Sequence, residues 1–166
     1  GKWFGYQHEG ILPDVVTSAK ALGNGVPIGA CLARGVAATI LSPGTHGSTF
    51  GGNPLACSAA LAVLDVVNEK NLLERSRLLG NFFATAFRRK LASRNEVIEV
   101  RGKGLMVGIE LDRPCGELVK ICSSRGVLIN VAAQNVVLLL PPLIISDDQA
   151  TEIVENVSAS IFDFLE

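Results

Sequence analysis

Apolar residues recur along the 166-residue chain with two different spacings, and the spacing predicts the type of each element. Short apolar runs at 14–19 and 28–33 predict two buried strands, separated by a glycine-rich loop. Residues 42–54 contain four glycines and two prolines, which predict a second loop. Residues 1–12 follow neither spacing, so we expect them to be irregular.

Helical spacing begins directly after the second loop. Asn53 is a favoured N-cap residue, and Pro54 occupies the first helical position, where its missing N–H costs nothing. The helix predicted here is rich in alanine, which permits close packing. A second helix is predicted over 71–93 by its apolar stripe, which consists of Leu72, Leu73, Leu79, Phe82, Phe83, Ala86 and Phe87.

After Ser93 the pattern changes to short alternating runs interrupted by turns. Ser146 is a favoured N-cap for a last helix, and Asp147 and Asp148 in its first turn suit the helix dipole. The elements predicted in this part are a hairpin over 97–111, a helix over 116–126 that ends at Gly126, strands over 127–130 and 136–140, and a helix over 147–165. The chain is therefore predicted to be α/β, with a smaller α+β part at its C-terminal end.

Composition narrows the functional classes. The residues are 48% hydrophobic and only 19% charged, which suggests that a subunit interface or a further part of the protein covers some of the surface. A net charge of -1 gives no electrostatic support for binding nucleic acid or an anionic membrane. No apolar run reaches the roughly 20 residues of a membrane span. The chain also lacks a signal peptide and an initiator Met, so we expect it to be a piece of a longer protein.

The four cysteines are spaced irregularly and include no Cys-x-x-Cys pair: they are Cys31, Cys57, Cys115 and Cys122. The only histidines are His8 and His46, so the ligand patterns of structural zinc sites are missing and we expect no metal. A disulfide framework is also unexpected in a chain of this size. Reduced thiols and a cytoplasmic location fit this composition best.

Lys20 is the only charged residue between Asp14 and Arg34. It follows a predicted buried strand and precedes a loop that contains Gly23, Gly25 and Gly29. Desolvation disfavours the charged ammonium and leaves a free amine, which forms Schiff bases with carbonyl compounds such as pyridoxal phosphate. The structural alternative is a lysine with a buried stem and an ammonium that reaches solvent.

The second loop offers a complementary set of groups. Ser48 and Thr49 supply hydroxyls, Gly51 and Gly52 supply accessible backbone, and a helix begins immediately afterwards. Hydroxyls and free N–H groups near a helix start can bind phosphate. A glycine-rich connection between two elements is the alternative, and the segment is not a P-loop because no Gly-Lys-Ser/Thr follows. An amine and a phosphate-binding loop are together what pyridoxal phosphate requires.

Four segments, in this order, resemble the class III (ornithine-type) aminotransferases of fold type I, and most nearly the acetylornithine/succinylornithine group. They are PDVVTSAKALGNGVPIGA, THGSTFGGNPLACSAALAVLD, VRGKGLMVGIEL and LLPPLIIS. The resemblance implies that residues 1–84 are the end of a large cofactor-binding domain with the Schiff-base lysine and an interdomain helix. It implies that residues 85–166 are a small C-terminal α+β domain.

The resemblance also implies roles for single residues. Lys20 matches the lysine that holds pyridoxal 5'-phosphate covalently and then moves a proton. Ser48 and Thr49 match hydroxyl residues that reach the cofactor phosphate of the neighbouring subunit, so a homodimer with composite active sites is implied. The expected reaction moves the terminal amino group of N-acetylornithine, or a similar ornithine derivative, to 2-oxoglutarate in arginine metabolism.

Two departures from the family keep alternatives open. Only the C-terminal part of such an enzyme is matched, and the acidic residue that pairs with the pyridine nitrogen is expected before Gly1. Leu138 stands where the family usually has an arginine that binds the substrate carboxylate, and leucine cannot form that bidentate pair. The alternatives are a class III aminotransferase with a different amine donor, or a non-catalytic copy that keeps the fold and dimerises.

Overall fold

A computed structural model describes residues 1–166, and the chain divides into two compact units. The first unit comprises residues 2–71, and the second comprises Gly1 together with residues 72–166. The two units are described separately below. The domain boundary expected after residue 84 lies inside the helix Leu72–Lys90.

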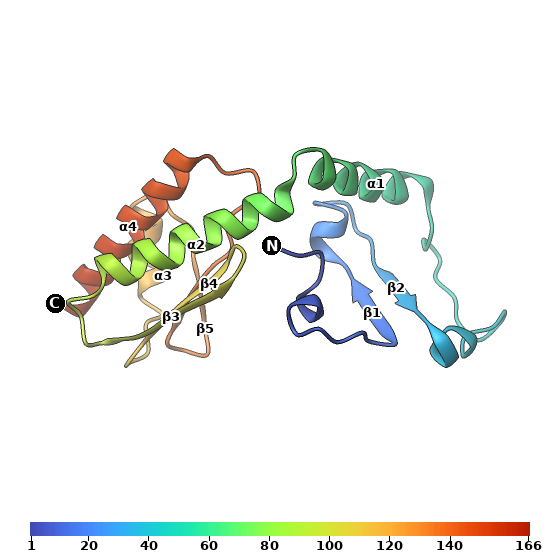
Figure 1. Cartoon of the computed structure of the whole chain (residues 1–166), viewed down its shortest axis with the longest axis horizontal. Helices are drawn as coiled ribbons and strands as arrows, with labels where there is room; N and C mark the ends of the chain where they lie inside the picture. The colour runs from blue at the N-terminus through green and yellow to red at the C-terminus, as the bar shows by residue number, and fades with distance from the viewer. The chain divides into compact units, whose positions relative to one another are not determined.

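The first unit contains a two-stranded sheet and one long helix (Figure 1). Strands β1 (Val15–Ser18) and β2 (Ala30–Ala33) pair in antiparallel fashion, with Thr17 opposite Cys31. Helix α1 spans Pro54–Glu69. Short 3-10 helices occur at Gly5–His8, Lys20–Leu22 and Gly35–Thr39.

The predicted strands exist, but the prediction that they are buried is wrong. Val15 in β1 is 47% exposed and Leu32 in β2 is 52% exposed. A sheet of only two strands has little apolar surface of its own to cover either face. The apolar runs therefore predict the two strands correctly, but the rest of this chain does not bury their side chains.

The start of α1 is as predicted. The Asn53 side-chain oxygen accepts a hydrogen bond from the backbone N–H of Ala56 at 2.9 Å, and Pro54 is the first helical residue. This cap satisfies one of the N–H groups that lack a partner in the first helical turn. Helix α1 therefore begins directly after the glycine-rich loop 42–52, with Asn53 as its N-cap.

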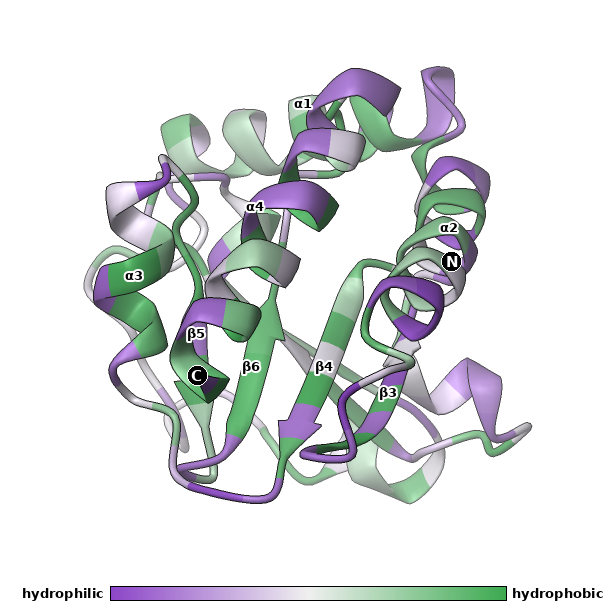
Figure 2. Cartoon of the chain, turned by 90° about the vertical axis from the view of Figure 1, so that its left-hand side faces the viewer, coloured by the Kyte–Doolittle hydropathy of each residue, from purple (hydrophilic) through white to green (hydrophobic).

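The second unit is a four-stranded antiparallel sheet with three helices, of which α4 lies between α3 and α2 (Figure 2). The strand order is β3-β4-β6-β5. The elements are α2 (Leu72–Lys90), β3 (Val97–Lys103), β4 (Met106–Leu111), α3 (Leu118–Ser124), β5 (Asn130–Ala132), β6 (Val136–Leu139) and α4 (Asp147–Leu165). The predicted helix–hairpin–helix–strand–strand–helix order is confirmed.

The main hydrophobic core lies in this second unit. Phe83 and Phe87 of α2 are fully buried and stack with their ring centroids 6.1 Å apart. They belong to the same cluster as Ile109 of β4 and Val157 and Ile161 of α4. Burial of side chains of this size contributes about 1.5–3 kcal/mol each, so this unit holds most of the apolar stabilisation.

One predicted strand begins later than expected. The Val127 N–H donates to the Cys122 carbonyl at 3.0 Å, and Gly126 has a φ of 80°. These features cap the C-terminal end of α3, so residue 127 is not free to pair with a strand. Ladder pairing with β6 begins only at Asn130, which lies opposite Leu138.

Candidate functional site

Lys20 lies two residues after the end of β1 and begins a 3-10 helix. Its backbone is in the left-handed region, with a φ of 52°. This conformation is uncommon for a lysine and costs about 1–3 kcal/mol, and residues that hold it cluster at functional sites. The observation therefore makes Lys20 a candidate site residue on grounds that the sequence pattern did not contain.

The Lys20 side chain is exposed in this chain. Its ammonium makes no hydrogen bond or ion pair with any other residue. The desolvation considered for this amine is absent within this chain, because the strand that precedes Lys20 is itself half exposed. The amine is therefore accessible, which a Schiff-base lysine must be before it reacts.

Ser48 and Thr49 are exposed in the loop that precedes α1. Neither hydroxyl makes a hydrogen bond within the chain, and the backbone N–H groups of residues 47–52 donate none either. The loop packs tightly on itself, since a Cβ atom on Gly51 would lie 2.9 Å from the Cβ of Ser48. Free hydroxyls and N–H groups on one loop fit an anion such as phosphate.

The predicted site residues all lie in the first unit, on two different loops. No hydrogen bond or ion pair joins Lys20 to Ser48 or Thr49. Leu138 lies in the second unit on β6, opposite Gly108 on one side and Asn130 on the other. Because its side chain is uncharged, Leu138 cannot form an ion pair with the carboxylate of a substrate.

Gly23 lies next to the candidate lysine, and its burial is not predicted by the sequence pattern. The sequence presents it as one of several loop glycines, yet it is the one buried residue among residues 1–52. Its N–H donates to the Lys20 carbonyl at 3.1 Å. The only sequence signal for this turn is the spacing of three positions between Lys20 and Gly23.

No group of three or more His, Cys, Asp or Glu side chains could hold a metal ion. None of the helices is long and apolar enough to cross a membrane. All four cysteines are free thiols, and burial raises the pKa of Cys115 and of Cys122 above the usual value.

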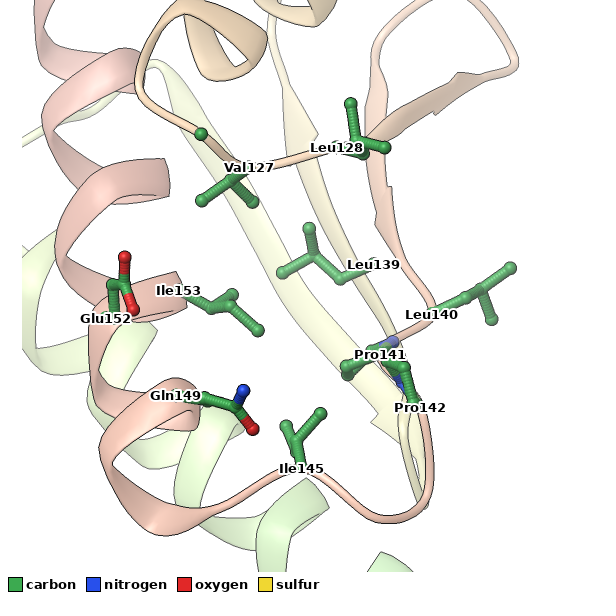
Figure 3. A pocket seen from close by; sticks show the side chains of 11 residues that line it. Val127, Leu128, Leu139, Leu140, Pro141, Pro142, Ile145, Gln149, Glu152 and Ile153 are labelled. Carbon is green, nitrogen blue, oxygen red and sulfur yellow. The ribbon is translucent and has the colours of Figure 1, made fainter.

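A cavity of about 420 Å³ in the second unit is separate from these residues. Figure 3 shows Val127, Leu139, Ile145 and Ile153 pointing into it from the segment after α3, from β6, from the following loop and from α4. Its lining is mostly apolar, and none of the predicted site residues belongs to it. It therefore offers none of the amine or hydroxyl chemistry found on the first unit.

Comparison with known proteins identifies the family to which both units belong. Residues 1–161 match the family model described as Aminotransferase class-III. The acetylornithine aminotransferase of Nitrosomonas europaea is 51% identical over 166 residues, which are 100% of this chain and 42% of that protein. The chain thus spans about 42% of the length of that curated relative.

Two solved structures show the same fold. The acetylornithine aminotransferase of Elizabethkingia anophelis has a TM-score of 0.88 and 36% identity, over 98% of this chain and 44% of that one. An ornithine aminotransferase of Toxoplasma gondii, with partial occupancy of PLP at its active site, has a TM-score of 0.91 and 33% identity. That match covers 98% of this chain and 39% of the other. The predicted fold class is confirmed, and the chain belongs to the class-III aminotransferase family.

Proposed function

We propose that this chain is part of a pyridoxal-phosphate-dependent aminotransferase of arginine biosynthesis. It would move the terminal amino group of N-acetylornithine, or a similar ornithine derivative, to 2-oxoglutarate. The observation that carries this proposal is the strained, exposed Lys20 with an unpaired amine, on a chain 51% identical to an acetylornithine aminotransferase.

The groups present on the first unit fit the cofactor. Pyridoxal 5'-phosphate, when bound, supplies an aldehyde that reacts with an amine and an electron-withdrawing ring. Lys20 offers a primary amine without an internal partner. Ser48 and Thr49 offer hydroxyls without an internal partner, which can donate to phosphate oxygens.

Each residue then has a distinct task. Lys20 Nζ would hold the cofactor covalently and, once released, take a proton from the substrate carbon that bears the amino group. The hydroxyls of Ser48 and Thr49, with the free N–H groups of their loop, would fix the phosphate and so orient the ring. Holding both ends of the cofactor restricts its orientation, which lowers the entropy lost on reaching the transition state.

The proposed active unit is a homodimer in which Ser48 and Thr49 serve the partner's site. Two observations support it: no hydrogen bond joins these residues to Lys20, and large apolar side chains stand exposed on the first unit. They include Ile11, Leu12, Val36, Ile40, Leu41, Phe50, Leu55 and Leu61. Such side chains are typical of covered surface in an obligate assembly.

We further propose that residues 1–84 act as the end of the cofactor-binding domain and residues 85–166 as the small C-terminal domain. A cytoplasmic location is supported by the four free thiols. Leu138 favours one alternative, a class-III aminotransferase with an amine donor that is not recognised by an arginine at this position. It also favours, less directly, a non-catalytic copy that keeps the fold and dimerises.

The test uses protein from its native source, incubated with pyridoxal phosphate and reduced with borohydride. Intact mass and peptide mapping should place one pyridoxyl group on Lys20, and the Lys20→Arg variant should lose it. Glutamate production from 2-oxoglutarate with N-acetylornithine, ornithine or 4-aminobutyrate then identifies the donor. Adducts spread evenly over Lys2, Lys20 and Lys70 would contradict the proposal.

A further inference from the structure

We infer that Gly23 is a positioning residue, whose missing side chain keeps Lys20 in its left-handed backbone conformation. The importance of this position rests on the proposed function, because it is the Lys20 amine that would react. The backbone relationship between the two residues is a separate claim, and it can be tested without any cofactor.

A chain of backbone hydrogen bonds closes the segment around Lys20. The Leu22 N–H donates to the Ala19 carbonyl at 3.0 Å, and the Gly23 N–H donates to the Lys20 carbonyl at 3.1 Å. The Val26 N–H then donates to the Gly23 carbonyl at 3.1 Å. Gly23 is the one residue that takes part in two of these three hydrogen bonds, as donor in the turn around Lys20 and as acceptor in the following turn.

The second turn leaves no room for a side chain at this point. A Cβ atom on Gly23 would lie 2.1 Å from the carbonyl oxygen of Val26 and 2.8 Å from Cγ2 of Ile28. The nearer atom belongs to the backbone, so it cannot rotate away as the end of a flexible side chain would. By contrast, a Cβ atom on Gly25 would meet nothing within 4 Å, although its φ is 112°. Gly23 therefore needs to be glycine because a side chain would clash there, whereas Gly25 needs to be glycine because of its positive φ.

The consequence for Lys20 follows from its strain. A lysine at a φ of 52° returns to negative φ unless the surrounding structure prevents it. Any residue larger than glycine at position 23 must push the Val26 carbonyl away and open the adjoining hydrogen bonds. The restraint on Lys20 is then lost, and rotation about its φ swings the whole side chain, with its amine, in a new direction.

The experiment compares two glycines that are equally crowded and lie in different units. Gly23→Ala is the test variant. Gly80→Ala is its matched control, since a Cβ atom on Gly80 would lie 2.2 Å from the Gly104 carbonyl oxygen. Both variants of the full chain should lower the midpoint of thermal unfolding. Only Gly23→Ala should change the Cα and Cβ chemical shifts of Lys20, which report whether its backbone is left-handed.

A chemical measurement connects the conformation to the proposed function. After reaction with pyridoxal phosphate and borohydride, Gly23→Ala should lower the adduct on Lys20, relative to Lys2 and Lys70, by about tenfold. Gly80→Ala should leave this ratio unchanged. If wild-type Lys20 shows no preferred adduct, the proposed function fails, while the chemical shifts still decide the role of Gly23. Unchanged Lys20 shifts in a folded Gly23→Ala variant, or equal effects of the two variants, would overturn the inference.

A measurement on the wild-type chain keeps the inference testable even if Gly23→Ala does not fold. The Gly23 N–H is hydrogen-bonded, whereas the Asn24 N–H donates to no group in the chain. Hydrogen exchange at Gly23 should therefore be at least tenfold slower than at Asn24, after correction for intrinsic rates. Equal exchange at the two amides would mean that the turn is open and that Gly23 does not restrain Lys20.

Discussion

Gly80 of α2 packs directly on the backbone of Gly104, so that a Cβ atom on Gly80 would lie 2.2 Å from the Gly104 carbonyl oxygen. In an exposed helix, Gly→Ala stabilises by about 1 kcal/mol because alanine has the higher helix propensity. Here the clash with backbone costs more, typically about 1–3 kcal/mol for an overpacked site. We expect Gly80→Ala to lower the free energy of unfolding by about 1 kcal/mol, measured by urea denaturation.

Gly116 provides the comparison for this variant. A Cβ atom there would meet nothing within 4 Å, and the residue is exposed. Gly116→Ala should therefore not lower the urea midpoint, and the lower flexibility of alanine in the unfolded chain should raise it slightly. A stabilised Gly80→Ala variant would mean that α2 moves away from the hairpin easily, and that the close approach does not matter for stability.

Ser158 of α4 is a second packing feature with a measurable cost. Its side chain is 2% exposed, and its hydroxyl has no hydrogen-bond partner. Leaving a buried polar group unsatisfied costs about 1–3 kcal/mol. Ser158→Ala should therefore raise the free energy of unfolding by about 1 kcal/mol, seen as a higher midpoint of thermal unfolding.

The matched control for Ser158 lies two residues away on the same helix. Ser160 is also fully buried, but its hydroxyl donates to the Asn156 carbonyl at 2.8 Å. Ser160→Ala removes a satisfied group, so we expect no gain and a small loss of stability. If both alanine variants stabilise the chain equally, the missing hydrogen bond of Ser158 is not the cause.

Local signals in the sequence predicted the helices well. Asn53 and Ser146 accept the hydrogen bonds expected of N-caps, from Ala56 N and Gln149 N respectively. Capping depends on residues three positions apart, so a short stretch of sequence contains all the information required. The same holds for the hairpin β3–β4, whose alternation and glycines are contiguous.

Features that depend on distant residues could not be predicted in this way. The burial of β1 depends on what covers its faces, which no local pattern specifies. Strand β5 begins late because the Val127 N–H donates to the Cys122 carbonyl in the cap of α3 and so cannot pair with β6. The positive φ of Lys20 depends, in our proposal, on the missing side chain of Gly23, and lysine itself has no preference for that conformation.

The strain at Lys20 has a consequence for stability. Glycine adopts positive φ without steric cost, whereas a lysine at a φ of 52° is strained. Allowing for the greater flexibility of glycine in the unfolded chain, we expect Lys20→Gly to raise the free energy of unfolding by about 0.5–1 kcal/mol. Lys20→Ala should not, because alanine is also strained there. Denaturation midpoints of the two variants, measured together, check this.

Lys70→Gly is the control, because it makes the same substitution at a lysine whose backbone is not strained. Its φ is −90°, so Lys70→Gly relieves nothing and only makes the unfolded chain more flexible. We expect it to destabilise the chain slightly. If Lys20→Gly behaves like Lys70→Gly, then Lys20 does not hold the left-handed conformation in solution.

The two buried thiols predict how stability changes at alkaline pH. Burial raises the pKa of Cys115 and of Cys122, the latter against a smaller opposing effect of a hydrogen bond with Ser160. Above about pH 8.5 the unfolded chain loses these protons while the folded chain keeps them, so stability must fall as pH rises. The slope is at most about 1.4 kcal/mol per pH unit for each thiol. Below about pH 7 both states are protonated, and the two thiols cause no change.

The free energy of unfolding, measured by urea denaturation between pH 7 and 10, tests this prediction. Cys115→Ala should reduce the alkaline slope, even though the cavity it creates also lowers stability at every pH. Cys31→Ala is the control, because Cys31 is an exposed free thiol and its removal should leave the slope unchanged. A wild-type chain whose stability is flat up to pH 10 would show that the thiolates are accommodated in the folded core. An equal reduction of the slope by Cys31→Ala would show that burial is not its cause.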